Sequence, residues 1–187
     1  DETIVSIQDG IGLSVNLIPQ PETGLVGWRA RKHAGMIDVD LPKQHPVSAF
    51  WEKVTTADLS GGGLILNPDE FYILVSRECV TVPEHYAAEM SAYDTRVGEF
   101  RAHYAGFFDP GFGMSTLGAS STRAVLEVRS HDVPFLVEEG QTVCRLVYEP
   151  LSEVPLQLYG EQGSGSNYQA QGLQLAKHFL PPESDVT

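Results

Sequence analysis

Two acidic residues of this chain lie among neighbours that could shield them from water. Asp109 belongs to the stretch HYAGFFDPGFG, residues 103–113, where it stands between a phenylalanine and a proline. Glu127 belongs to AVLEV, residues 124–128, and has apolar neighbours on both sides. A positioned carboxylate can take a proton from water and return it to a leaving group. The two residues are therefore candidates for acid–base chemistry and for ligand binding.

Each acidic residue also has an ordinary structural interpretation. Asp-Pro-Gly is a common turn sequence, and an aspartate in such a turn can bind the local backbone with its side chain. Glu127 could instead lie on a solvated strand face and form an ion pair with Arg123 or Arg129. The sequence leaves both interpretations open.

Several motifs of nucleotide-binding proteins and hydrolases are absent from the sequence. The chain contains neither G-x-x-x-x-G-K-[ST] nor G-x-G-x-x-G, and it contains no G-x-S-x-G. A zinc deaminase would need H-x-E together with P-C-x-x-C, and neither occurs. The six histidines show no H-x-H or H-x-x-x-H spacing, so we do not expect a zinc site.

The charge of the chain limits the partners that it can bind. Over 187 residues the formal net charge is −13, with only 12 Lys and Arg residues and no basic run. Nucleic-acid affinity depends largely on cationic side chains that neutralise phosphates, so we expect no nucleic-acid binding. A small anion could still bind, since a few local cations and backbone N–H groups suffice for it.

The N-terminus and the cysteines bear on where the protein works. No apolar run approaches the roughly 18 residues of a transmembrane helix, so we expect no membrane span. The N-terminal DETIVSIQDG lacks the basic and apolar regions of a signal peptide, and it lacks an initiator methionine. We therefore expect a chain that is processed or cut from a longer one. Cys79 and Cys144 fit two buried free thiols in a cytoplasmic protein.

The hydrophobic pattern predicts an all-β protein. Residues 123–130 show the clearest alternation, with Ala124, Leu126 and Val128 on one face and Arg123, Val125, Glu127 and Arg129 on the other. Short strands with close turns and little helical periodicity are typical of a sandwich, jelly roll or barrel.

Other segments of the chain are less regular. Residues 45–54 could form a short helix, and residues 168–179 could form a C-terminal helix or an extended arm. GEQGSGSN, residues 160–167, has the composition of a flexible stretch. Further β-rich runs between Gly, Pro, Asn and Asp turns lie at 12–18, 24–30, 64–66, 71–76 and twice within 133–151.

Several of these segments together resemble the dCTP deaminase branch of the dUTPase-like family. The matching pieces occur in the family's order from about residue 64 to 179: a strand before VP, then Arg96, AGFFDPGFG, VLEV, EEGQTVCRLVYE and LYG…SNYQAQG. With GLSVNL near the start, the chain is most similar to the C-terminal half of the long, tandem-domain bacterial enzymes. The resemblance implies a single domain over 1–187, with N-terminal strands in 1–60, a core in 61–160 and a C-terminal arm in 161–187.

The resemblance implies a fold, an assembly and a reaction. The fold would be a distorted β jelly roll that assembles as a trimer or pseudo-trimer, with nucleotide sites between subunits. The reaction would be the zinc-independent hydrolysis of dCTP to dUTP and ammonia, with Glu127 activating the water that attacks C4 of cytosine. Mg²⁺ would arrive with the triphosphate rather than in a protein cage. The implied ligands are dCTP, dUTP and dTTP.

Further positions that match the family motif imply substrate contacts. Asp109 would accept the 3′-hydroxyl of the deoxyribose, and packed aromatic residues and glycines would exclude a 2′-hydroxyl. Backbone groups of Val125 and Leu126 would read the edge of the base, and Arg96 would organise the phosphate region. Two C-terminal residues would close over the nucleotide, Tyr159 and Gln171.

The chain departs from the family pattern at positions that should contact phosphate or water. In place of Arg/Lys-Ser-Ser-x-x-Arg it has SAYDTR, which puts Ser91 at the basic position and Ala92 at a serine position. Asp94 adds a negative charge, Asn167 replaces a family lysine, and the link between DPG and LE is longer. Because each charge-assisted hydrogen bond contributes about 1.5–3 kcal/mol, these changes predict weaker triphosphate binding.

Three functions therefore remain open from the sequence. The first is a dCTP deaminase, which the retained VLEV and FFDPGFG favour. The second is a non-catalytic trimerisation or regulatory nucleotide-binding half of the same enzyme, which SAYDTR and Asn167 favour. The third is a dUTPase-type pyrophosphatase, in which the acid of the Asp109 loop positions a water for attack on phosphate.

Overall fold

The structure of the chain is a computed structural model that describes residues 10–92, 100–102, 106–117, 122–130 and 132–180. Its named strands pair in antiparallel fashion throughout. Helix within the described part of the chain is limited to three single turns: α1 (Val47–Phe50), η1 (Thr56–Asp58) and η2 (Ser115–Leu117). The all-β prediction is confirmed.

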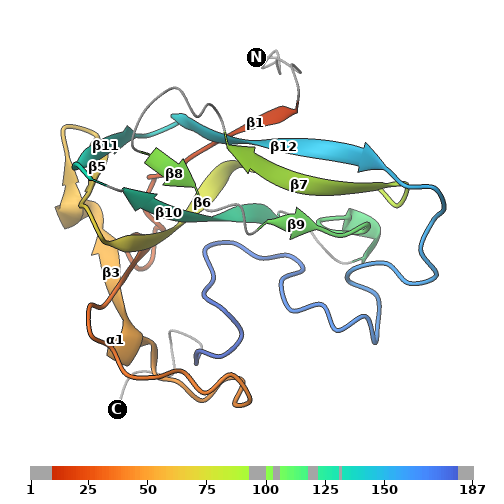
Figure 1. Cartoon of the computed structure of the whole chain (residues 1–187), viewed down its shortest axis with the longest axis horizontal. Coiled ribbons are helices and arrows are strands. Elements are labelled where there is room, and N and C mark those ends of the chain that lie inside the picture. Colours follow the sequence, from red (N-terminus) through yellow and green to blue (C-terminus); the bar gives the residue numbers. More distant parts are fainter. Residues whose placement is uncertain (1–9, 93–99, 103–105, 118–121, 131, 181–187) are drawn as a thin grey trace.

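The strands form three sheets, whose arrangement Figure 1 shows. The four-stranded sheet has the order β1 (Ile11–Ser14), β12 (Thr142–Pro150), β7 (Tyr86–Ala92) and β9 (Phe107–Phe108). The five-stranded sheet has the order β3 (Trp51–Thr55), β2 (Leu25–Ala30), β6 (Phe71–Cys79), β10 (Arg123–Ser130) and β8 (Phe100–Ala102). The three-stranded sheet has the order β11 (Phe135–Glu138), β5 (Gly63–Leu66) and β4 (Leu59–Ser60).

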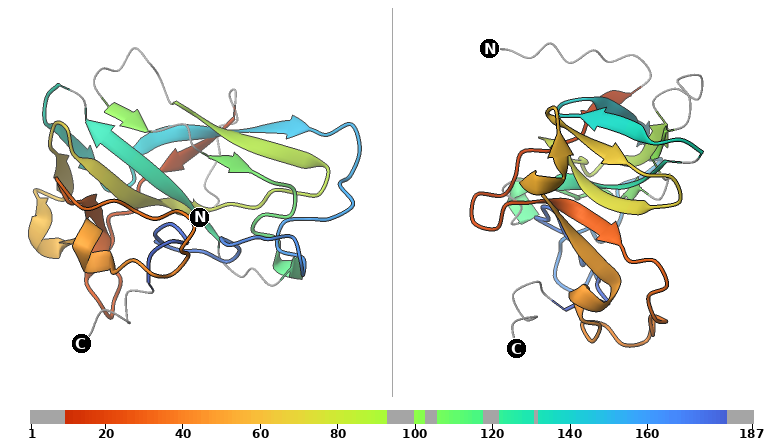
Figure 2. Two further views of the ribbon diagram at one scale, coloured as in Figure 1. Left: turned by 60° about the horizontal axis from the view of Figure 1, so that its bottom comes forward. Right: turned by 90° about the vertical axis from the view of Figure 1, so that its left-hand side faces the viewer.

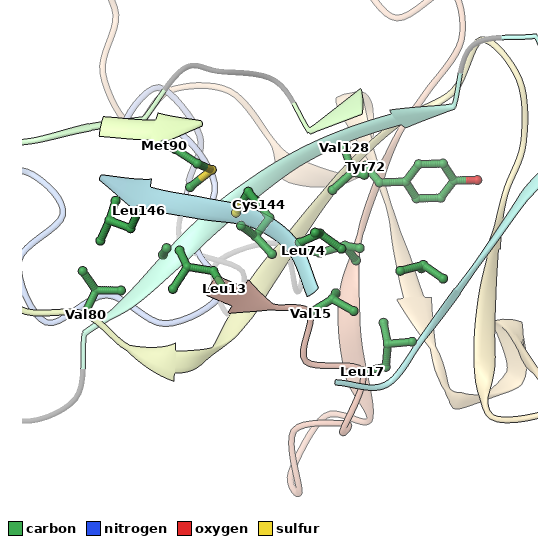
Figure 3. Close-up of a cluster of buried hydrophobic side chains, with 14 of the residues drawn as sticks. Leu13, Val15, Leu17, Tyr72, Leu74, Val80, Met90, Val128, Cys144 and Leu146 are labelled. Atoms are coloured by element: carbon green, nitrogen blue, oxygen red, sulfur yellow. The ribbon is translucent and has the colours of Figure 1, made fainter. Parts of the chain in front are cut away.

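The main hydrophobic core lies between the four-stranded and five-stranded sheets. Figure 3 shows Leu13, Met90 and Leu146 from the first sheet near Leu74 and Val128 from the second. Burial of each such side chain contributes about 1.5–3 kcal/mol, and this face-to-face packing holds the two sheets together. The core face of β10 is therefore fixed by the packing of both sheets.

A second apolar cluster covers the opposite face of the five-stranded sheet. Its buried members include Trp28 of β2, Ile73 of β6, and Leu175 and Phe179 of the C-terminal segment. Strand β6 is therefore buried on both faces, which explains why its sequence FYILV is continuously apolar rather than alternating. In Figure 1 and in the left view of Figure 2, the C-terminal segment runs beneath the strands.

Most of the predicted strands are confirmed. The run 123–130 is β10 over its full length, and Ala124, Leu126 and Val128 are at most 1% exposed. The run 24–30 is β2, and the pairs of strands at 64–76 and 133–151 are β5, β6, β11 and β12. Segment 45–54 is divided between the single turn α1 and strand β3.

One prediction of local structure needs correction, and the structure decides one alternative that the sequence left open. The strand expected over 12–18 ends at Ser14, because the chain then leaves β12 and crosses to β6, where Asn16 donates a hydrogen bond to the Val75 carbonyl at 2.9 Å. Residues 168–179 do not form a helix, which leaves the alternative of an arm, although this arm is not a regular strand. They follow an irregular path that ends in a parallel bridge between His45 and Phe179.

The prediction of two buried thiols is half right. Neither cysteine forms a disulfide, and Cys144 on β12 is buried, but Cys79 at the end of β6 is exposed. The chain leaves the two-sided packing of the sheet at this end of β6, so the last residues of the strand reach solvent. None of the helices in the described part of the chain is long and apolar enough to cross a membrane.

Candidate active site

A cavity of about 530 Å³ lies between one face of the five-stranded sheet and the C-terminal segment. The sheet contributes Val125 and Glu127 of β10 to its lining, together with apolar and aromatic side chains of β6 and β3. The loop after β9 contributes Asp109, and the C-terminal segment contributes several polar residues: Tyr159, Asn167, Tyr168, Gln171 and Gln174. The cavity thus joins segments that are far apart in the sequence.

Glu127 reaches the cavity because of the alternation along β10. Its neighbours Leu126 and Val128 face the main core, so Glu127 faces the other side, opposite Ile73 of β6. Among the described residues its carboxylate has no hydrogen-bond or ion-pair partner. Arg123 and Arg129 are engaged elsewhere. Glu127 is therefore a carboxylate that lines a cavity and is available to a ligand.

The two arginines beside Glu127 have identifiable contacts. Arg123 donates from Nη1 to the Ser76 carbonyl oxygen at 2.9 Å. The guanidinium carbon of Arg129 lies 5.4 Å from the centre of the Phe71 ring, in a cation–π contact. The interpretation of Glu127 as one half of a surface ion pair is therefore not supported in the described part of the chain.

The Asp109 loop is held by backbone hydrogen bonds rather than by the Asp109 side chain. The Phe112 N–H donates to the Asp109 carbonyl at 3.1 Å, and Val82 exchanges hydrogen bonds of 3.0 and 2.9 Å with Gly111 and Phe112. Within the described residues the Asp109 carboxylate has no hydrogen-bond partner, and the residue is exposed. The turn interpretation explains the backbone of this loop but leaves the carboxylate free for a ligand.

Glycine at position 113 is required by the loop's close approach to the strand before it. Its φ is +70°, and a Cβ added there would lie 2.0 Å from the Val80 carbonyl oxygen. The ring of Phe112 meanwhile packs 5.0 Å from the ring of Phe108 and 5.7 Å from that of Tyr159. The aromatic residues and glycines of FFDPGFG thus fix the loop against both the core and the C-terminal segment.

The peptide groups of Val125 lie on the edge of β10 that faces away from β6, where none of the described residues pairs with them. The partner of Val125 in the register is Val75, whose carbonyl accepts from Asn16 and therefore points away from β10. Directly opposed residues in an antiparallel pair either exchange both hydrogen bonds or both point away, so the peptide groups of Val125 also point away from β6. On that outer edge β8 pairs with residues 128–130. The peptide groups of Leu126 point toward β6 instead.

The C-terminal segment builds the opposite wall of the cavity. The Tyr159 hydroxyl accepts a hydrogen bond from the Tyr168 N–H at 2.9 Å, and burial raises the pKa of Tyr159. Gln171 is 8% exposed, and its carbonyl accepts from the Arg123 N–H at 3.0 Å. This bond pairs the start of β10 with the C-terminal segment and brings the two walls together.

Of the residues assigned from the sequence, Glu127, Asp109, Val125, Tyr159 and Gln171 all line the cavity. The Leu126 side chain is fully buried in the main core and does not line it. Arg96 lies outside the described residues, as do Tyr93, Asp94 and Thr95 of the SAYDTR stretch. Asn167 lines the cavity and donates to the Gly165 carbonyl at 2.9 Å.

One end of the cavity was not anticipated from the sequence. Trp51 of β3 and Phe71 of β6 line it, with ring centres 6.0 Å apart. The indole nitrogen of Trp51 is buried and has no hydrogen-bond partner among the described residues. No local motif connects position 51 with Glu127, because they meet only through the strand order β3-β2-β6-β10.

The described residues contain no group of three or more His, Cys, Asp or Glu side chains placed to hold a metal ion. A divalent ion bound chiefly by a nucleotide's phosphates would not require such a group. The Mg²⁺ expected from the sequence would therefore be bound mainly by the phosphates of a nucleotide and not by protein side chains.

Known proteins resemble this chain in sequence and in fold. The profile of the "2'-deoxycytidine 5'-triphosphate deaminase (DCD), C-terminal domain" family matches residues 1–179. A "dCTP deaminase, dUMP-forming" of Methanobrevibacter smithii is 30% identical over 150 residues, which cover 78% of this chain and 68% of that protein. A protein of the same description from Corynebacterium glutamicum is 32% identical over 114 residues, which cover 59% of this chain and 56% of that protein.

A solved structure extends the comparison to the fold. The crystal structure of 2'-deoxycytidine 5'-triphosphate deaminase from Agrobacterium tumefaciens matches with a TM-score of 0.70 and 56% sequence identity. The match covers 78% of this chain and 42% of the Agrobacterium chain, so this chain spans less than half of that relative. The profile match over nearly the whole chain and the shared fold together show that the chain belongs to the family of dCTP deaminase C-terminal domains.

Proposed function

We propose that the cavity binds a deoxycytidine nucleotide and that Glu127 catalyses the hydrolytic deamination of its base. The observation that carries the proposal is the convergence in one cavity of three groups: the Glu127 carboxylate, which has no partner among the described residues, the Asp109 carboxylate, and the backbone of Val125 on the edge of β10 that faces away from β6. Family membership supplies the substrate class, since the relatives are dCTP deaminases by name.

The chemistry asks for one proton-transferring group at C4 of cytosine. The Glu127 carboxylate takes a proton from water as the water oxygen bonds to C4, which becomes tetrahedral. The carboxyl group passes this proton to N3 of the base, takes the second proton from the new hydroxyl group on C4, and delivers it to the amino nitrogen. The C4–N bond breaks, ammonia leaves, and a carbonyl forms at C4. Every proton transferred in these steps moves among Glu127, water and the base.

The neighbouring groups suit recognition of the rest of the nucleoside. The Asp109 carboxylate accepts a hydrogen bond from the 3′-hydroxyl. The packed ring of Phe112 and the glycines of the same loop leave little room for a 2′-hydroxyl. The peptide groups of Val125, directed away from β6, read the donor and acceptor edge of the base. Leu126 has its peptide groups in the ladder with β6, so we assign this readout to Val125 in particular.

The phosphates are the least specified part of the substrate. Arg96 is the proposed phosphate-side residue, and Mg²⁺ would enter with the triphosphate. Ser91, Ala92 and Asn167 stand where the family resemblance would place groups for phosphate or water. A trimer or pseudo-trimer with sites between subunits could supply those groups from a neighbouring domain.

The product is a separate question that the relatives raise. Two of them are described as dUMP-forming, whereas the Agrobacterium protein is described only as a deaminase. Deamination alone gives dUTP and ammonia, while a second hydrolysis gives dUMP and pyrophosphate. Product analysis by anion-exchange chromatography distinguishes the two outcomes. It would also detect a dUTPase-type activity when dUTP is the substrate.

The first prediction concerns Glu127. With dCTP and Mg²⁺, Glu127→Gln should reduce ammonia release by at least about 100-fold, because the amide cannot shuttle the proton. Calorimetric affinity for dCTP should stay within about twofold, since the side-chain shape is kept. Equal ammonia release by the variant would remove Glu127 from the mechanism. Binding without ammonia release by the unmodified chain would instead favour the non-catalytic nucleotide-binding alternative.

A further inference from the structure

Gln169 connects the C-terminal segment to the loop that carries Asp109. Its side-chain oxygen accepts a hydrogen bond from the Gly113 N–H at 3.1 Å, and its side-chain nitrogen donates to the Gly111 carbonyl at 3.2 Å. Each partner can play only one of these roles, so the orientation of the amide is determined by the backbone it meets. One side chain thus holds the loop at two points, two and four residues after Asp109.

The surrounding backbone leaves room for this amide. Gly160 has φ +96°, and a Cβ there would lie 2.5 Å from the side-chain nitrogen of Gln169. Gly111 has φ +98°, and a Cβ there would lie 2.7 Å from the Tyr159 carbonyl oxygen. Both glycines therefore permit the close approach of the C-terminal segment to the loop.

Two residues later the same segment binds β10. The Gln171 carbonyl accepts from the Arg123 N–H at 3.0 Å, and its side-chain nitrogen donates to the Arg123 carbonyl at 3.4 Å. Ala170 between the two glutamines has φ +57°, a left-handed conformation that costs a non-glycine residue about 1 kcal/mol. The left-handed conformation of Ala170 lets the two glutamines bind different partners. Residues 169–171 thus join the Asp109 loop to the start of β10.

We propose that Gln169 is a positioning residue that holds Asp109 at a fixed distance from β10 and so determines selection of the 2′-deoxyribose. Gln169 is not among the residues that line the cavity, so it acts through the loop and not by touching the ligand. The inference rests on the proposed function, because the sugar it selects is that of the deoxycytidine nucleotide. It adds a residue that the family resemblance did not assign.

Gln169→Glu tests the proposal with little change in side-chain size. A carboxylate can still accept from Gly113, but it cannot donate to the Gly111 carbonyl, and it places a negative charge beside that oxygen. Gln162→Glu is the matched control, since it makes the same charge change in the same segment at an exposed side chain. Both variants are made in the Glu127→Gln background, so that bound nucleotide is not converted.

Affinities for dCTP and CTP are measured by calorimetry with Mg²⁺ present. Gln169→Glu should weaken dCTP binding by about 10-fold and bring the ratio of the two affinities toward one. The control should leave the ratio unchanged. An unchanged ratio in Gln169→Glu would overturn the proposal. So would an equal loss for both nucleotides with a lower unfolding midpoint, which would indicate a general structural role.

A measurement without nucleotide separates this inference from the proposed function. The Gly113 amide should exchange with deuterium more slowly in the unmodified chain than in Gln169→Glu, because only the unmodified chain holds the loop at both points. Equal exchange rates would overturn the positioning role whatever the chain binds. A chain that prefers dCTP over CTP but releases no ammonia with Glu127 intact would contradict the deaminase and leave the role of Gln169 standing.

Discussion

At the scale of single residues, burial on one face of a strand decides which groups can react. The alternation of β10 directs Leu126 into the core and Glu127 into the cavity, although the two residues are adjacent. The same contrast separates the two cysteines, since Cys144 is buried on β12 and Cys79 is exposed at the end of β6. Burial, followed by the negative charge of Glu78, raises the pKa of Cys144 to about 12.

This pKa predicts the reactivity of Cys144. In a Cys79→Ser variant at pH 8, the remaining thiol should not react with a disulfide reagent in the native protein and should react fully in urea. The pKa of Cys144 in the folded state lies above the reference value of 9.0. The contribution of the protonated Cys144 thiol to folding stability is therefore complete below pH 9 and is lost as the pH rises toward about 12. Stoichiometric labelling of the native variant at pH 8 would show that Cys144 is accessible.

At the scale of elements, the Asp109 loop connects β9 and η2 and is held by contacts on two sides. The loop backbone forms hydrogen bonds with Val82, and the ring of Phe112 packs on that of Phe108. On the other side, the Gln169 side chain accepts a hydrogen bond from the loop backbone. The loop therefore presents Asp109 to the cavity while the carboxylate itself takes no part in holding the loop. Close backbone contact at Gly113 is the feature that a single added methyl group would disturb most.

Gly113→Ala should lower the free energy of unfolding by about 2–4 kcal/mol. The added Cβ combines a left-handed conformation with a clash against the Val80 carbonyl. Gly24→Ala is the control, because Gly24 has a similar φ of +66° but nothing lies within 4 Å of an added Cβ. The control should therefore lower the free energy of unfolding by only about 1 kcal/mol. Urea denaturation measures both. Equal losses in the two variants would show that the loop can move away from Val80.

At the scale of the whole molecule, two hydrophobic clusters lie on opposite faces of the five-stranded sheet. The main cluster joins this sheet to the four-stranded sheet, and the second attaches the C-terminal segment that forms a wall of the cavity. Phe179 is central to the second cluster, with ring centres 5.6 Å from Phe50 and 5.8 Å from Trp51. The cavity therefore depends on packing between the end of the chain and strands near its beginning.

Phe179→Ala should loosen this segment more than it destabilises the whole fold. Removing the ring frees the chain around Lys177, so cleavage there by trypsin under native conditions should accelerate by at least about 10-fold. The thermal unfolding midpoint should change little, because the main core is untouched. Leu156→Ala, at a side chain that is fully exposed, is the control. Unchanged cleavage in Phe179→Ala would show that other contacts suffice to hold the wall.

The sequence by itself determined the local features of this protein. Hydrophobic alternation identified β10 and its core face, and turn residues separated the strands. The motifs FFDPGFG and VLEV pointed to Asp109 and Glu127, and they also carried part of the family resemblance. These features depend on residues within a few positions of one another, where periodicity and turn chemistry are informative.

Only the tertiary structure decided how these parts meet. Trp51 and Phe71 joined the cavity through strand order, and Gln169 joined the Asp109 loop through an irregular segment with no periodicity to predict. The direction of the Val125 peptide groups was likewise decided by its partner Val75, some 50 positions earlier in the chain. Such contacts are long-range pairings, and their formation depends on the packing of both cores rather than on local preference.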